Sequence, residues 1–90
     1  MPRILVADDN EDLRENIAQW LSHQGDEVDT AEDGIAATRR LQENSYDVLI
    51  LDWEMPGKTG VEIVREYRAS GGVGVVILLT GRTDIDDKEI

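Results

Sequence analysis

The sequence has no cysteine, no phenylalanine and only two prolines, and its aromatic residues are two tryptophans and two tyrosines. Without cysteine the chain can form neither a disulfide framework nor a thiolate metal site, which excludes the disulfide-stapled secreted scaffolds. Long apolar runs are also missing, because the longest, such as 75–79, fall far short of the roughly 20 residues that a membrane helix needs. With 90 residues, the chain is expected to be one small soluble domain.

Basic residues are scarce: nine lysines and arginines stand against twenty aspartates and glutamates, which gives a net charge of -11. This charge repels nucleic-acid phosphate and anionic lipid, so we expect no nucleic-acid and no membrane partner, and it suits a cation or a basic protein surface. No hydrophobic segment of signal-peptide length precedes the acidic stretch that begins at Asp8. We therefore expect a cytoplasmic protein.

Continuous apolar runs alternate with amphipathic segments along the chain. The runs are rich in valine, isoleucine and leucine, which is typical of parallel strands covered on both faces. The segments between them repeat their apolar residues at helical spacing. The predicted elements are strands at 4–7, 27–31, 47–52 and 74–80, and helices at 11–24, 35–43, 61–69 and from 84 onward. This order predicts an α/β layered sheet with right-handed crossovers.

Local signals predict where the helices begin and which residues they bury. Asn10 or Asp9 is expected to cap the first helix, and Gly25 stands where that helix should end. Trp20 belongs to the apolar stripe of the first helix and is expected in the core, while Ile35 is expected on the apolar face of the second helix.

Acidic residues and one hydroxyl follow the predicted strands. Asp8 and Asp9 follow the first strand, Asp52 ends the third, and Thr80 ends the fourth. Ligands of open α/β sheets bind beyond the carboxyl ends of the strands. If the first and third strands are neighbours, three carboxylates converge beside a hydroxyl, and such an all-oxygen set suits magnesium. Taken alone, the pair Asp8 and Asp9 is better explained as turn and helix-cap residues, and it is the coincidence across three strands that favours a site.

Four motifs carry a family resemblance over essentially the whole chain, namely Ile4–Asn10, Leu51–Gly57, Gly60 and Leu78–Gly81. In these motifs the chain resembles the response-regulator receiver domains of two-component signalling, including the chemotaxis regulators. The resemblance implies a flavodoxin-like parallel sheet with helices on both faces and strand order 2-1-3-4. The family's fifth strand and fifth helix have no counterpart in these residues. Residues 1–90 are therefore expected to be a single, incomplete, C-terminally shortened receiver domain.

The resemblance also implies a chemistry. Asp52 would accept a phosphoryl group from a histidine kinase or a phosphotransfer protein in a phosphorelay. Mg²⁺ would be held by Asp8, Asp9, Asp52 and the backbone carbonyl of Glu54. Thr80 would be the switch hydroxyl that bonds to the phosphoryl oxygens. The protein would thus be a signalling phosphoprotein and not an enzyme.

Departures from the family leave alternatives open. Neither Lys58 nor Lys88 occupies the position of the family's phosphoryl-pairing lysine, so phosphotransfer is expected to be impaired in these 90 residues alone. Self-association or a complementing chain is expected to cover the exposed edge of the fourth strand. The alternative function is a phosphorylation-incompetent assembly module that acts through this edge. A haloacid-dehalogenase-like phosphatase is less favoured, because Glu54 stands where that family has an aspartate.

Overall fold

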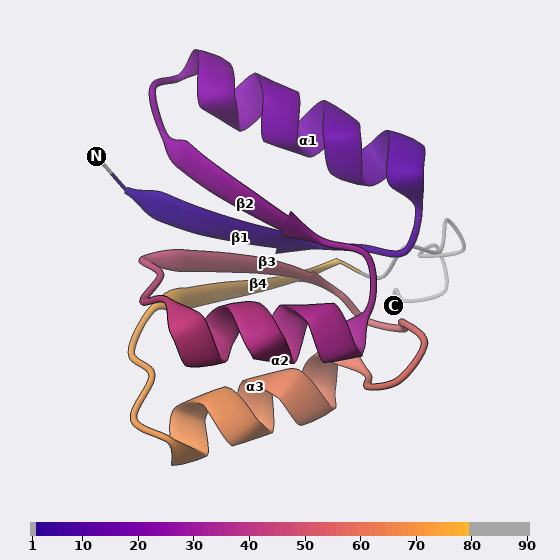
Figure 1. Ribbon diagram of the computed structural model, residues 1–90, viewed down its shortest axis with the longest axis vertical. Coiled ribbons are helices and arrows are strands. Elements are labelled where there is room, and N and C mark those ends of the chain that lie inside the picture. Colours follow the sequence, from indigo (N-terminus) through magenta and orange to yellow (C-terminus); the bar gives the residue numbers. More distant parts are fainter. Residues whose placement is uncertain (1, 80–90) are drawn as a thin grey trace, which may run out of the picture.

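The computed structural model describes residues 2–79, in which strands and helices alternate as predicted (Figure 1). The strands are β1 (Arg3–Ala7), β2 (Glu27–Ala31), β3 (Val48–Asp52) and β4 (Val75–Leu79), and the helices are α1 (Glu11–His23), α2 (Gly34–Glu43) and α3 (Gly60–Ala69). All neighbouring strands pair in parallel in the order β2-β1-β3-β4. This order confirms the predicted flavodoxin-like fold. The expected end of the fourth strand at Thr80 and the helix expected from 84 onward lie outside the described residues.

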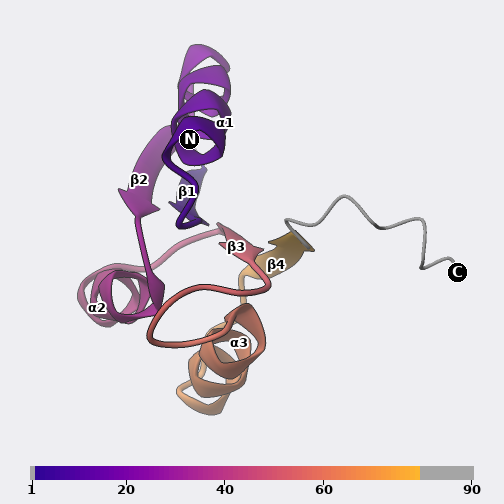
Figure 2. The same ribbon diagram turned by 90° about the vertical axis from the view of Figure 1, so that its right-hand side faces the viewer.

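The two faces of the sheet carry different helices. Figure 2 shows α1 on one face and α2 and α3 on the other. The main core lies between the sheet and the α2/α3 pair, and its buried residues include Leu5, Leu49, Leu51, Ala37 and Ile63. Because side chains alternate along a strand, the neighbours of these strand residues point to the α1 face. The continuous apolar runs of β1 and β3 therefore reflect helices packed on both faces.

Capping side chains set the positions at which the helices begin. The Asn10 side chain accepts a hydrogen bond of 3.0 Å from the Leu13 N–H, so Asn10 is the cap of α1. At the other end of α1, Gly25 adopts a positive φ of 92°, a conformation that favours glycine and ends the helix. Among residues 2–79 no helix is long and apolar enough to cross a membrane.

Two expected core residues are in fact exposed. Trp20 is 64% exposed, because α1 packs on β1 and β2 without fully burying any of its residues. Ile35 is 50% exposed, because α2 turns its smallest residues, Gly34 and Ala37, toward the interior. The prediction for both side chains was wrong, because the helices bury only small residues or none against the sheet.

The acidic residue in the middle of β2 has a structural role. Asp29 accepts hydrogen bonds from the Tyr46 hydroxyl at 2.7 Å and from Arg3 at 3.1 Å. Burial alone would raise the pKa of Asp29, but these hydrogen bonds and the Arg3 charge lower it. Burial and the bond to Asp29 raise the pKa of Tyr46 to about 12. Asp29 therefore joins β2 to β1 and to the segment before β3.

Candidate functional site

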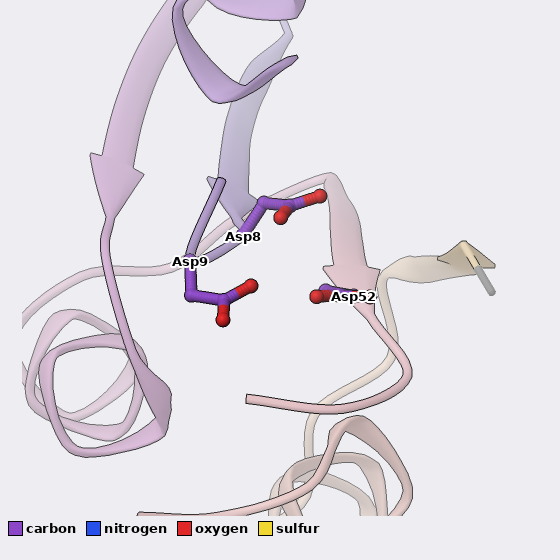
Figure 3. Close-up of side chains that lie close together, drawn as sticks. All are labelled: Asp8, Asp9 and Asp52. Carbon is purple, nitrogen blue, oxygen red and sulfur yellow. The ribbon is translucent and has the colours of Figure 1, made fainter. Parts of the chain in front are cut away.

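Three carboxylates meet where β1 and β3 end. The two strands pair with Ala7 opposite Leu51, so that Asp8 and Asp52 come next at the same level. Asp9 follows in the loop toward α1. One carboxylate oxygen from each aspartate lies within 4.8 Å of the other two. Figure 3 shows the three side chains gathered around the space between the two strand ends.

Asp8 is fixed by hydrogen bonds on three sides. Its N–H donates to the carbonyl of Ala31 at 3.1 Å, and its Oδ1 accepts from the N–H of Asn10 at 2.9 Å. Its carbonyl accepts from Nη1 of Arg14 at 2.9 Å. The second carboxylate oxygen, Oδ2, is buried and has no hydrogen-bond partner in the described part of the chain. A buried carboxylate oxygen without a partner is costly, and a cation beside it removes that cost.

Asp52 is positioned by the start of α3. The N–H of Trp53 donates to the carbonyl of Leu79 at 2.7 Å, and the carbonyl of Trp53 accepts from Gly60 at 2.9 Å. A Cβ on Gly60 would lie only 2.5 Å from the carbonyl oxygen of Asp52. Glycine at this position therefore allows α3 to begin directly against the end of β3, which holds the loop after Asp52 in place.

The carboxyl group of Asp52 is hard to ionise. Burial, together with the negative charge of Asp8 and a hydrogen bond with Asp9, raises its pKa to about 6. A hydrogen bond from the backbone of Glu54 opposes the rise. Asp8 and Asp52 are only 2% and 6% exposed, so little water shields their repulsion. The cluster therefore has a built-in preference for an added positive charge.

The donor set fits a hard divalent cation. It consists of carboxylate oxygens, which suit Mg²⁺ better than softer metals, and it includes the unpartnered buried oxygen of Asp8. Of the residues predicted for the site, the structure brings together Asp8, Asp9 and Asp52. Glu54 lies in the loop that follows, with an exposed side chain, and Thr80 lies outside the described residues. The roles assigned to all of these residues stay predictions.

Two basic residues near this end of the sheet have different positions. Lys58 is the one lysine in the described part of the chain, and its Nζ is bonded at 2.6 Å to Glu66 on α3. Arg14, which the sequence analysis did not single out, contacts the backbone of Asp8. Its place in the first turns of α1, four residues after the cap, is the signal that could have indicated this contact.

The raised pKa of Asp52 predicts a stability that depends on pH in the absence of divalent cations. The unfolded chain ionises Asp52 near the ordinary pKa of 3.8, whereas the folded chain does so near 6. Stability is therefore lost as the pH rises through this interval, and the loss persists above it. We expect Asp52→Asn to raise the free energy of unfolding at pH 8 by about 1–3 kcal/mol, since one pKa unit corresponds to about 1.4 kcal/mol.

Urea unfolding in EDTA at pH 4 and pH 8 measures this effect. Glu15→Gln, which removes an exposed charge from α1, is the matched control and should not produce the same difference between the two pH values. Equal stability of Asp52→Asn and the wild type at pH 8 would contradict the repulsion inferred within the cluster.

Known proteins resemble this chain in sequence and in fold. Residues 4–90 match the family model of the response regulator receiver domain. The transcriptional regulatory protein PrrA of Mycobacterium tuberculosis is 39% identical over 87 residues, which cover 97% of this chain and 37% of that protein. The response regulator protein PmrA of Pseudomonas aeruginosa is 37% identical over 86 residues, covering 96% and 39%. The chain thus spans less than half the length of these relatives.

Solved structures agree with this match. The response regulator TrrA of Thermotoga maritima, crystallised in complex with Mg²⁺-BeF, superposes with a TM-score of 0.84 at 39% identity, covering 99% of this chain and 77% of that one. A crystal structure of histidine kinase ThkA in complex with TrrA matches with a TM-score of 0.81 at 43% identity, covering 90% and 70%. The family model, the identities and the superposed sheet together show that the chain belongs to the receiver-domain family of two-component response regulators.

Proposed function

We propose that this chain is a phosphoacceptor, in which Asp52 takes a phosphoryl group from the phosphohistidine of a histidine kinase or a phosphotransfer protein. The observation that carries the proposal is the convergence of three carboxylates on one space, with one buried oxygen of Asp8 left unpartnered. Two structures of the similar protein TrrA support the proposal, since one contains Mg²⁺-BeF and the other contains a histidine kinase.

In the proposed reaction a carboxylate oxygen of Asp52 attacks phosphorus. The bond between phosphorus and the imidazole nitrogen breaks, and its electron pair goes to the nitrogen. Such a transfer depends mainly on positioning and on neutralising charge. The strand register and the start of α3 position Asp52, while Asp8, Asp9 and the carbonyl of Glu54 join it as proposed Mg²⁺ ligands. When bound, Mg²⁺ supplies positive charge to the phosphoryl oxygens.

Two further parts of the proposal concern Thr80 and residues 1–90 as a unit. Thr80, next in sequence after β4, is the proposed switch hydroxyl. Residues 1–90 are proposed to act as one receiver unit in the cytoplasm.

Phosphorylation by a small-molecule donor tests this function. With acetyl phosphate and Mg²⁺ we expect one phosphoryl group, on Asp52, to be added slowly. The rate is low because no lysine of the described residues reaches the cluster, and losing one such charge costs about 100-fold or more in rate. Intact mass spectrometry should detect the product in the wild type and no product in Asp52→Asn or in EDTA.

A fusion protein distinguishes a site that is phosphorylated slowly from a chain that has no phosphorylation site. Joining the chain to the part of the neighbour TrrA that lies outside the match, which covers 77% of that chain, should increase the rate about 100-fold. A fusion that stays unmodified, or a phosphoryl group that forms equally in Asp52→Asn, would contradict the proposed role of Asp52.

We also propose that the chain self-associates through β4. Val75 and Ile77 are 61% and 45% exposed, and they pair with Val48 and Ile50 of β3 on the face of the sheet opposite to α2 and α3. Helix α1 lies on this face above β1 and β2, so the side chains of β4 form an exposed apolar surface. Such a surface at a sheet edge favours contact with another strand or another copy.

Sedimentation velocity tests self-association. We expect an assembly that grows with protein concentration and with added salt, because salt screens the repulsion between copies of charge -11. Ile77→Ser should weaken it, whereas Ile35→Ser, which removes a similarly exposed isoleucine from α2, should not. A wild type that stays monomeric at high concentration and high salt would defeat this proposal.

A further inference from the structure

A second polar site lies at the edge of β2, apart from the three carboxylates. The described residues form there an open cavity of about 360 Å³. Arg14 from α1 and Arg39 and Arg40 from α2 line it, together with Thr30 from β2. Three of the seven arginines in the chain thus surround one cavity, although the net charge of the chain is -11. We call this space the arginine cavity.

Backbone carbonyls hold two of the three guanidinium groups. Nη1 of Arg14 donates to the carbonyl of Asp8 at 2.9 Å, and Nε of Arg40 donates to the carbonyl of Thr30 at 3.3 Å. A guanidinium has five N–H donors in a planar fork, so each group keeps donors for a ligand. The carbonyl bonds also fix the orientation of the forks before any ligand arrives.

Carboxylates do not neutralise these arginines by direct pairing. Glu32 and Glu43 also line the cavity, but the ion pairs within 4.0 Å among the described residues are Arg3 with Asp29 and Lys58 with Glu66. Three positive and two negative side chains leave the cavity with a net positive charge. Although the rest of the chain is strongly acidic, the net positive charge of this cavity favours the binding of anions there.

We propose that the arginine cavity binds an oxyanion group, a phosphate or a carboxylate, carried by a small ligand. Planar guanidinium forks match the geometry of both groups and bind them with charge-assisted hydrogen bonds. Thr30 adds a hydroxyl to the lining, and the volume lies in the range of small-ligand pockets. The site uses none of the three clustered carboxylate side chains, so it stands whether or not Asp52 is a phosphoacceptor.

Titration of the wild-type chain with inorganic phosphate, and separately with acetate, tests the proposal. Nuclear magnetic resonance should follow the arginine Nε–H signals and the backbone amides, at constant ionic strength and in EDTA. We expect saturable shifts confined to the residues that line the cavity. Tighter binding of phosphate indicates a phosphate-bearing ligand, and tighter binding of acetate indicates a carboxylate.

Arg39→Gln is the decisive variant, because Arg39 is exposed and makes no hydrogen bond or ion pair within the described residues, so its loss should not affect folding. We expect binding of the preferred anion to weaken about fivefold, the effect of one lost hydrogen bond. Arg65→Gln removes an exposed arginine from α3 and should leave the affinity unchanged. Glu43→Gln should strengthen binding, and Asp52→Asn should not affect it.

Two results would overturn the proposal. One is the absence of saturable shifts with either anion. The other is equal weakening by Arg39→Gln and Arg65→Gln, since this would show that the anion responds to overall charge and not to a built site.

Discussion

Parallel pairing of β1 with β3 is the constraint on which the site depends. The register that sets Ala7 opposite Leu51 leaves Asp8 and Asp52 side by side at the sheet edge, where both are buried. Two like charges at such a position repel one another, and this repulsion contributes to the rise of the Asp52 pKa to about 6. The fold therefore concentrates electrostatic repulsion at one point, and a cation bound there would relieve it.

The surrounding structure keeps this strained arrangement from relaxing. The Asn10 cap holds the start of α1, the bond from Arg14 holds the carbonyl of Asp8, and Gly60 lets α3 approach the end of β3. Each contact fixes backbone and leaves the carboxylates facing a common space. Such rigid support is what a phosphoacceptor needs, because the chemistry depends on position more than on reactive groups.

Much of this could be predicted from the sequence, because the relevant signals are local. The apolar runs of β1, β3 and β4 indicated a parallel sheet, and the aspartates that end two of the strands indicated a site at their carboxyl edge. The depth to which each helix is buried was not predictable: Trp20 and Ile35 belong to apolar patterns yet are exposed. Contacts between residues far apart in the sequence were also missed, because they depend on the arrangement of the strands in space, as with Tyr46 and Asp29, which are 17 positions apart.

The central claim is that the three carboxylates form one cation site, and a magnesium titration read by tryptophan fluorescence tests it most directly. Trp53 follows Asp52 directly and is 46% exposed, whereas Trp20 lies on α1, so a Trp20→Phe variant isolates the reporter at the site. The account predicts a saturable change in emission in the wild type and in Trp20→Phe, and no change in Asp9→Ala. An unchanged signal in the folded wild type, or a change that persists in Asp9→Ala, would contradict it.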